Sequence, residues 1–244
     1  MGTVFFERVT YKKYSDRMDE MLKYLIFDVD NTLIRYNEDF YPESYKMAFQ
    51  KLGLDESNAN KVFFLINEYE SLLSEENPCY NREKMLDYIN NNLHTTYDMK
   101  LIDELLYVFS HYWTRKEDIM IKKETLDYLY KKYELYIYSN YFADAIAERI
   151  KNLGFSDYFK GVFGADIYGT KEYESSYKRI LDERGWKAEE CVMIGDSKKR
   201  DILPPVNLGM KAILVDDDGL RDNPAIYVKD YKKINDVNDL IYIV

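Results

Sequence analysis

YLIFDVDNTLI, residues 24–34, joins a short apolar run to two carboxylates, and this stretch decides the fold. The run at 25–27 suits a strand that is buried on both faces, as in a parallel sheet. Asp28 would then stand at the carboxyl end of that strand, where open α/β sheets place their ligand sites. Asp30 lies two residues further on, and two carboxylates so close repel each other unless a cation or a shared proton offsets the charge. The stretch therefore predicts a metal site at a strand end.

Two other interpretations of this stretch lead to different chemistry. An Asp-rich turn could merely stop a strand. A calcium-binding loop needs an acid or amide at its fifth position and glycine at its sixth, but Thr32 and Leu33 stand there. The calcium interpretation is therefore poor, and the choice between a catalytic motif and an incidental turn depends on the rest of the chain.

The composition is typical of a folded protein that does not bind nucleic acid. The 244 residues suit one domain with a large insertion or two small domains, and 32% of them are charged. A net charge of −10 disfavours nucleic acid and anionic membranes as partners, because phosphate groups favour a positive surface. Cys79 and Cys191 are too few for a disulfide framework and are not spaced as zinc ligands. With no apolar run long enough for a membrane span or a signal peptide, a cytoplasmic protein is expected.

The pattern of apolar residues divides the chain into three parts. Residues 1–20 are a polar lead-in without a motif. From 37 to 116 apolar residues recur at three- and four-residue steps, which is the helical pattern. Helices are expected there at 44–52, 60–73, 82–90 and 101–113. The expected domains are an N-terminal extension (1–20), a discontinuous core (21–36 and 117–244) and a helical insertion (37–116).

Strands and helices alternate after the insertion, which implies a parallel sheet with right-handed crossovers. Strands are expected at 135–138, 162–164, 191–194, 212–215 and, as a last short one, 226–228. Helices are expected near 122–133, 143–153, 174–184 and 237–241. Asp216-Asp217-Asp218-Gly219 is expected to be a solvent-facing turn.

Polar side chains follow four of the expected strands. They are Asp28, Asp30 and Thr32 after the first, Ser139 and Asn140 after the second, Lys171 after the third, and Asp196 and Asp201 after the fourth. The carboxyl ends of parallel strands converge on one crevice. A carboxylate pair, a hydroxyl, a lysine and a second acidic pair are what metal-assisted phosphoryl transfer through a carboxylate nucleophile needs.

The order and content of these segments resemble the haloacid dehalogenase superfamily, in its phosphatase branch. The match covers nearly the whole chain from Leu22 on, and it includes Gly154-Phe155-Ser156-Asp157-Tyr158-Phe159 and Gly195-Asp196-Ser197. The resemblance implies an α/β fold, a three-layer Rossmann-like parallel sheet core with an inserted helical cap domain. The long interval between Asp28 and Ser139 leaves room for the cap, and the short interval before Lys171 leaves room for no second one.

The resemblance also implies the central roles in catalysis. Asp28 would attack phosphorus and form an aspartyl phosphate, while Asp30 would protonate the leaving oxygen and then activate water. Mg²⁺ would be held by the Asp28 carboxylate, the Asp30 backbone carbonyl and Asp196, with Asp201 supporting these metal ligands from behind.

The remaining residues would bind the phosphoryl group. Ser139 would donate to its oxygens, and Lys171 would neutralise charge on them and on Asp28. Asn140 and Thr32 belong to the same phosphate-binding set, and Thr32 also helps to fix the loop.

One position departs from the family pattern. The lysine of this motif is usually followed by proline, but Glu172 follows Lys171. An acidic neighbour could loosen or reorient the lysine, and Lys178 is then the alternative.

The function expected from the resemblance is a Mg²⁺-dependent phosphatase that acts on a small phosphorylated metabolite. The alternatives are a metal-independent 2-haloacid dehalogenase, a phosphomutase-type transferase, and a non-catalytic phosphate-binding or regulatory module. Asp30 argues against the dehalogenase, which has no alkoxide leaving group to protonate. The sequence does not specify the substrate or the oligomeric state, and the substrate-contacting candidates in the insertion are Arg82, Lys84, Arg115 and the tyrosines.

Overall fold

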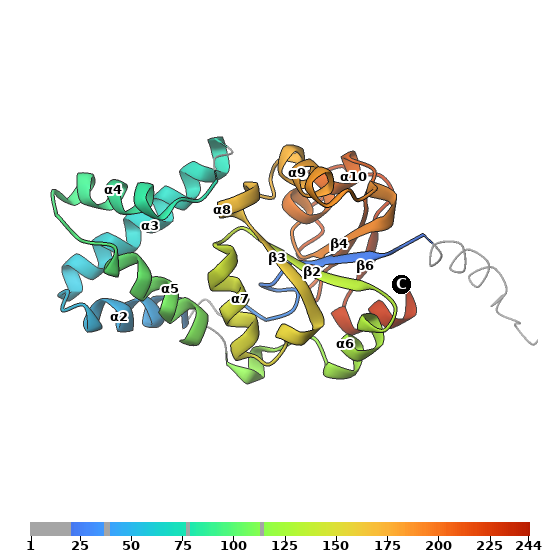
Figure 1. Ribbon diagram of the computed structural model, residues 1–244, viewed down its shortest axis with the longest axis horizontal. Coiled ribbons are helices and arrows are strands. Elements are labelled where there is room, and N and C mark those ends of the chain that lie inside the picture. The colour runs from blue at the N-terminus through green and yellow to red at the C-terminus, as the bar shows by residue number, and fades with distance from the viewer. Residues whose placement is uncertain (1–20, 37–39, 77–78, 113–114) are drawn as a thin grey trace, which may run out of the picture.

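A parallel sheet stands beside a group of helices in the computed structural model, which describes residues 21–36, 40–76, 79–112 and 115–244 (Figure 1). The six strands lie in the order β3-β2-β1-β4-β5-β6, and all neighbours are parallel. Their bounds are β1 Tyr24–Phe27, β2 Glu134–Ser139, β3 Phe159–Gly164, β4 Cys191–Gly195, β5 Lys211–Val215 and β6 Lys232–Ile234. Because β1 lies inside the sheet, the polar residues that follow it lie in the middle of the edge formed by the carboxyl ends of the strands.

Helices cover both faces of this sheet. The α-helices that follow the insertion are α6 Lys123–Tyr130, α7 Ala143–Asn152, α8 Ala165–Tyr168, α9 Glu174–Arg184 and α10 Leu203–Asn207. Shorter or irregular turns are η1 Lys116–Asp118, η2 Ser156–Tyr158, η3 Ala188–Glu190, η4 Lys198–Ile202 and η5 Val237–Tyr242. Helices α6, α7 and η5 pack on the face that carries Leu25 and Phe27, and α9 packs on the face that carries Ile26.

The burial of β1 on both faces is confirmed. Leu25, Ile26 and Phe27 are at most 1% exposed, and their side chains alternate between the hydrophobic cores on the two faces of the sheet. Each such side chain stabilises the fold by about 1.5–3 kcal/mol relative to an exposed position. The three-layer arrangement expected from the sequence is therefore present.

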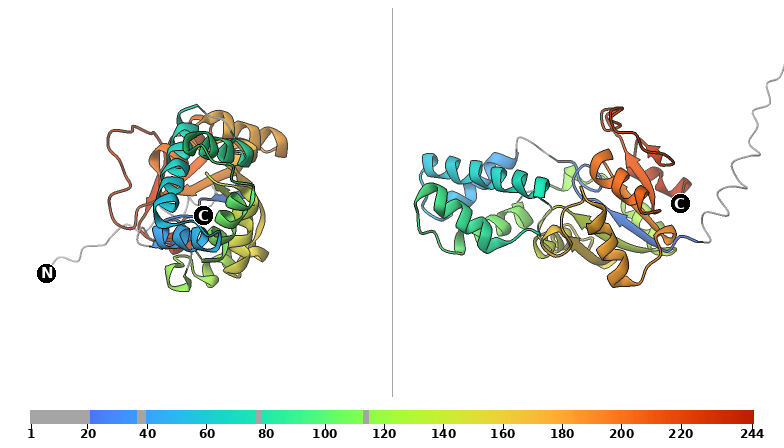
Figure 2. Two further views of the ribbon diagram at one scale, coloured as in Figure 1. Left: turned by 90° about the vertical axis from the view of Figure 1, so that its left-hand side faces the viewer. Right: turned by 90° about the horizontal axis from the view of Figure 1, so that it is seen from above.

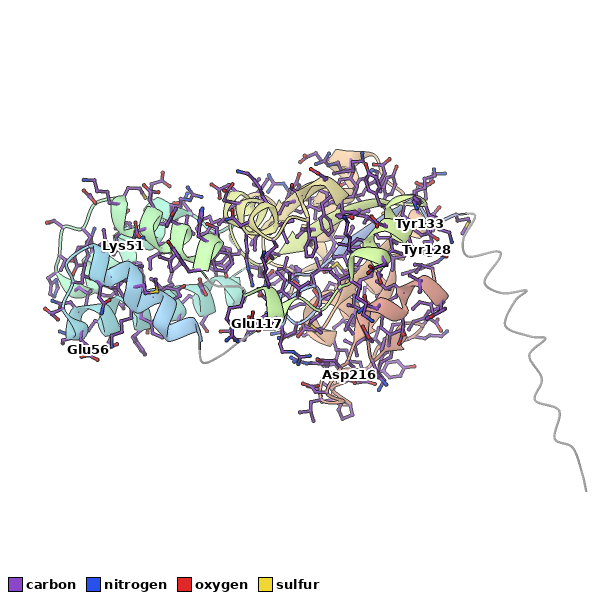
Figure 3. All side chains as sticks on the ribbon, turned by 90° about the horizontal axis from the view of Figure 1, so that it is seen from below. Lys51, Glu56, Glu117, Tyr128, Tyr133 and Asp216 are labelled. Atoms are coloured by element: carbon purple, nitrogen blue, oxygen red, sulfur yellow. The ribbon has the colours of Figure 1, made fainter. Side chains whose placement is uncertain are left out.

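Within the described residues, four α-helices between β1 and α6 form a group beside the core, and we call it the helical block. They are α2 Phe40–Lys51, α3 Glu56–Glu76, α4 Arg82–Leu93 and α5 Lys100–Tyr112. Figure 2 shows the block to one side of the sheet, and Glu117 marks where the chain has returned to the core (Figure 3). Helix α5 packs on α7 of the core, where Asn152 Nδ2 donates to Ser110 O at 3.0 Å. No helix within the described ranges has the length and apolar character to cross a membrane.

The last strand differs from its predicted position. β6 is Lys232–Ile234, whereas residues 226–228 lie in a turn and an irregular segment. Ile226 N donates to Asn223 O at 3.2 Å, and Tyr227 is 84% exposed. The run at 226–228 has the side chains of a strand, and Val228 packs against the core, but these residues pair with no strand, so the prediction is wrong. Residues 1–20, the predicted extension, lie outside the described residues.

Candidate active site

Three neighbouring strands end at the same level and bring the predicted residues together. Phe27 of β1 is paired with Ile137 of β2 on one side and with Ile194 of β4 on the other. The chain therefore leaves these strands side by side, and Asp28 N continues the ladder by donating to Ile194 O at 2.8 Å. A cavity of about 420 Å³ opens at this edge. Its lining includes Asp28, Asp30, Ser139, Asn140, Lys171 and Asp196.

The loop after β1 is folded by its own backbone and by Asn31. The amides of Leu33 and Ile34 both donate to Val29 O, at 2.9 and 3.0 Å. Asn31 has φ 56°, a left-handed conformation that asparagine tolerates better than most residues. Its Oδ1 accepts from Tyr36 N at 3.0 Å, which holds the end of the loop. The tight turn keeps Asp30 at the cavity.

Thr32 occupies a different place from the one predicted for a phosphate ligand. Its side chain is 0% exposed and does not line the cavity. Its backbone amide donates to Val29 O at 3.3 Å. Thr32 therefore supports the loop from inside, and direct contact with phosphate is not supported by this position.

Lys171 is the cation at the base of the cavity. It is 2% exposed, and its Nζ pairs with Asp28 Oδ1 and, at 2.7 Å, with Asp201 Oδ1. Burial opposes the charged form, but Asp201 and Asp28 outweigh it and raise the pKa of Lys171 above the ordinary lysine value. The ammonium is thus held charged beside the predicted nucleophile.

Glu172 does not draw the lysine out of the site. Asn140 Nδ2 donates to Glu172 Oε2 at 2.9 Å, and Asn140 Oδ1 accepts from Lys171 N at 2.7 Å. The Asn140 side chain therefore holds both the backbone of Lys171 and the carboxylate of Glu172. Lys178, the alternative, is 63% exposed and pairs with Asp182, so it does not reach the cavity.

Asp201 is fully buried behind the other carboxylates. Its Oδ1 accepts from Lys171, and its Oδ2 accepts from Ser197 N at 2.9 Å. A Cβ at Gly195 would come within 2.3 Å of the Asp201 carboxyl carbon, so only glycine leaves room for it. Both oxygens already have protein donors, which suits a supporting position rather than an outward-facing ligand.

Asp28, Asp196 and Asp201 form a group that fits a small divalent cation. Each offers an oxygen within 4.8 Å of the others. Burial raises the pKa of Asp28; Lys171 opposes this rise, and Asp201 and Asp196 add to it. Burial also raises the pKa of Asp196 to about 6. A bound divalent cation would offset this cost, and an all-oxygen set suits Mg²⁺ or Ca²⁺ rather than a softer metal.

Asp30 has a partner that the sequence does not reveal. Arg149 of α7 is 1% exposed, and its Nη2 donates to Asp30 Oδ1 at 2.9 Å. The same guanidinium lies over the ring of Phe109 of α5, 5.0 Å from the centroid. The predicted acid is therefore held by a core helix whose cation packs against the helical block.

Five further residues of the site were missed. From the core, Arg200 lines the cavity and Arg221 Nη1 contacts Asp196 Oδ2 at 3.1 Å; from the block, Asn67, Glu70 and Phe109 line the cavity. Arg200 directly precedes Asp201, so its place in that motif was the one available signal. The others reach the site only through tertiary packing.

The solvent-facing turn predicted for residues 216–219 is confirmed at Asp218 and Gly219, which are exposed in a bend, but the loop that leads from it to Arg221 begins at a buried residue. Asp216 is 1% exposed, and its Oδ1 accepts from Arg221 N at 2.8 Å. Asp216 thereby fixes the loop in the position from which Arg221 reaches Asp196. Figure 3 labels Asp216 on the core, away from Lys51 and Glu56 of the block.

The cations proposed from the sequence of the insertion do not line the cavity. Arg82 pairs with Asp144 of α7 and lies over Phe142, and Arg115 pairs with Asp118. Lys84 is exposed on α4. Among the described candidates, these three therefore lie outside the cavity lining, whereas Tyr45, one of the candidate tyrosines of the insertion, is part of it.

Comparisons with known proteins agree with this geometry. Residues 22–209 match the profile described as hydrolase, haloacid dehalogenase-like hydrolase. The chain is 25% identical to a 5'-nucleotidase of Pseudomonas aeruginosa, covering 80% of this chain and 84% of the relative. It is 26% identical to glyceraldehyde 3-phosphate phosphatase of Methanothermobacter thermautotrophicus, covering 90% and 98%.

Two solved structures share the fold. The HAD-hydrolase YfnB of Bacillus subtilis, bound to magnesium, has a TM-score of 0.63 at 16% identity, covering 91% of this chain and 98% of that one. A 2-haloacid dehalogenase of Pseudomonas syringae has a TM-score of 0.64 at 24% identity, with the same coverage. At these identities the likeness concerns the fold alone.

Proposed function

The chain belongs to the haloacid dehalogenase-like hydrolases, and on that premise we propose that it is a Mg²⁺-dependent phosphatase. In this proposal it hydrolyses a small phosphomonoester through a covalent intermediate on Asp28. The observation that carries the proposal is the buried pairing of Lys171 with Asp28 and Asp201, with Asp30 at the same cavity. The names of the phosphatase and nucleotidase relatives support it.

The first half-reaction transfers the phosphoryl group to Asp28. A carboxylate oxygen of Asp28 bonds to phosphorus while the bond from phosphorus to the ester oxygen breaks. Asp30 gives its proton to the departing oxygen, which leaves as an alcohol. Lys171 and the Ser139 hydroxyl stabilise the charge that develops on the phosphoryl oxygens.

The second half-reaction returns the enzyme to its starting state. Asp30, now ionised, takes a proton from water, and the water oxygen bonds to phosphorus as the bond to Asp28 breaks. Inorganic phosphate leaves, and Asp28 is again a carboxylate and Asp30 again an acid. The same side chain thus serves as acid and then as base.

The Asp28, Asp196 and Asp201 group is where Mg²⁺ would bind in this proposal. The Asp28 and Asp196 carboxylates and the Asp30 backbone carbonyl would hold the ion, with Asp201 behind them. When bound, it would screen the repulsion between these carboxylates and the substrate's phosphate.

The helical block would serve as the cap over this site. Tyr45, Asn67, Glu70 and Phe109 of the block share one cavity with Asp28 of the core. A cavity enclosed from both sides accepts a small leaving group and obstructs a folded protein surface. We therefore infer a soluble phosphorylated metabolite as substrate.

Phosphate release from a panel of phosphomonoesters tests the proposed function. The panel includes glyceraldehyde 3-phosphate, 5'-nucleotides, sugar phosphates and a phosphopeptide, with Mg²⁺ and with excess chelator. We expect a metabolite to exceed the phosphopeptide at least about a hundredfold in kcat/KM. Chloride release from 2-chloropropionate without metal, in the absence of phosphatase activity, would instead support the dehalogenase.

A further inference from the structure

Within the described residues, both cations that line the cavity lie at one end of it. The core end contains Lys171 and Arg200, which lie among the predicted catalytic aspartates. Asp201, Asp28 and Asp196 raise the pKa of Arg200 despite its burial, so both cations belong to the phosphoryl group's surroundings. The lysine and the arginine of this lining, which could face a phosphate, are therefore both at the core end.

The block end is lined by aromatic and polar side chains. They are Tyr45 of α2, Asn67 and Glu70 of α3, and Phe109 of α5. Within the described residues, this lining contains no lysine or arginine, and its one ionisable acid is Glu70. The leaving group of a substrate bound at the core end would extend toward this lining.

Asn67 and Glu70 form one polar edge of that lining. They are three residues apart on α3, so they lie on the same side of the helix. Asn67 Nδ2 donates to Phe63 O at 2.9 Å, which fixes the amide on its own helix. The Asn67 amide oxygen and the Glu70 carboxyl are both acceptor groups for hydroxyl hydrogens.

A second anion would be unfavourable beside Glu70. Burial raises the pKa of Glu70 to about 7, so the surroundings already disfavour one negative charge. A substrate carboxylate or second phosphate would add to that charge, and the described residues that line this end offer no lysine or arginine to pair with it. Neutral hydroxyls would not incur this cost.

The aromatic part of the lining suits the carbon skeleton of such a leaving group. The rings of Phe109 and Tyr141 pack at 4.3 Å between centroids and form a wall of the cavity. Aromatic faces bury C–H surface well while acceptors at the edge bind hydroxyls.

We propose that Glu70 and Asn67 form a subsite for hydroxyl groups of the leaving group, so that the protein selects neutral, hydroxyl-bearing phosphomonoesters over those with a second anionic group. This inference rests on the proposed phosphatase function. It concerns the block end of the cavity only.

A matched pair of probes tests the subsite. sn-Glycerol 3-phosphate and 3-phosphoglycerate have the same three-carbon skeleton, and a carboxylate replaces one hydroxymethyl group in the second. Each is measured as a substrate and as a competitive inhibitor of p-nitrophenyl phosphate hydrolysis, so that a probe that is not turned over still reports binding. For the wild-type protein we expect kcat/KM, or the inverse inhibition constant, to favour glycerol 3-phosphate by at least about tenfold.

Glu70→Gln should remove most of this discrimination. The variant keeps an acceptor and the side-chain size but loses the charge, so the ratio should fall below about threefold, mainly through tighter binding of 3-phosphoglycerate. Glu83→Gln, the same change at an exposed position of α4, should keep the wild-type ratio. Thermal unfolding of both variants shows that they are folded.

The outcomes separate the subsite from the reaction. A wild-type ratio near one or in favour of 3-phosphoglycerate would overturn the subsite even if Glu70→Gln failed to fold. A folded Glu70→Gln protein with an unchanged ratio would overturn it too. Absence of phosphate release from p-nitrophenyl phosphate and from the whole panel would overturn the proposed function, and the subsite with it.

Discussion

Replacing Lys171 by methionine should lower both the stability and the rate. Lys171 is 2% exposed, and its ammonium pairs with Asp28 and with Asp201, the latter at 2.7 Å. Methionine has a similar length but no charge, so it leaves two carboxylates in a buried site. Removing one partner of a buried pair costs about 3–5 kcal/mol. For a chain of this size, that is a fall in Tm of roughly 6–20 °C.

The rate should fall for a separate reason. In the proposed mechanism, the ammonium stabilises charge on the phosphoryl group, and loss of one such group costs about a hundredfold to a thousandfold in kcat. Urea unfolding of the metal-free protein, followed by circular dichroism, gives the change in free energy of unfolding. Phosphate release from the best metabolite gives kcat. Added Mg²⁺ should restore part of the stability because it returns positive charge to the carboxylates.

Lys178→Met is the matched control for this prediction. Lys178 is 63% exposed and pairs with Asp182 one helical turn away, an interaction worth about 0.3–0.5 kcal/mol. The Lys178→Met protein should keep the wild-type Tm and kcat. The reasoning would be refuted by a Lys171→Met protein with nearly wild-type stability and rate, or by loss of activity in Lys178→Met instead. A loss of stability with an unchanged kcat would leave Lys171 a structural role only.

Two further substitutions test the carboxylates. Asp28→Asn should reduce phosphate release by several orders of magnitude in a folded protein, because an amide is a poor nucleophile, and near-normal activity would exclude the aspartyl-phosphate mechanism. Asp196→Asn should raise the Mg²⁺ concentration for half-maximal activity at least about tenfold, while Asp182→Asn, at an exposed position, should not. Full activity of the wild-type protein in excess chelator would contradict the metal requirement.

The core of the site was predictable because its signals are local. Asp28, Ser139 and Asp196 each follow a run of strand residues, and parallel pairing brings such strand ends to one edge of a sheet. A sequence therefore indicates these neighbours without knowledge of any long-range side-chain contact. The wrong prediction of a strand at 226–228 shows where such local signals fail. A run of β-forming residues becomes a strand only if it pairs with a neighbouring strand, and the sequence of the run does not reveal that pairing.

The doubt about Lys171 could be resolved only in three dimensions. Glu172 stands where proline is usual, and along the chain it is the nearest charge to the lysine. In the fold, Asn140 accepts from Lys171 N and donates to Glu172, so the two side chains have separate partners. A residue that is distant in sequence thus holds both the backbone of Lys171 and the side chain of Glu172.

The polar residues of the helical block that line the cavity could not have been predicted, and the reason is geometric. Each helix of the block has several polar residues, and its hydrophobic pattern tells which side is buried but not which helix faces the cavity. Arg82 and Arg115 look like ligands for phosphate in the sequence, yet each is neutralised by an adjacent carboxylate. Glu70, an acid in a chain expected to bind an anion, would not be chosen from sequence at all.

Arg149 shows most clearly how the two parts of the protein depend on each other. It is nearly inaccessible, it donates to Asp30 at 2.9 Å, and it lies 5.0 Å over the ring of Phe109. A buried guanidinium without a carboxylate would be costly, so its pairing with Asp30 is strongly held. Phe109 also lines the cavity. One aromatic side chain of the block therefore contacts both the space for the proposed leaving group and Arg149, the cation that pairs with the proposed acid. The proposed proton donor and the proposed wall of the leaving-group space are therefore both positioned by the packing of α5 on α7.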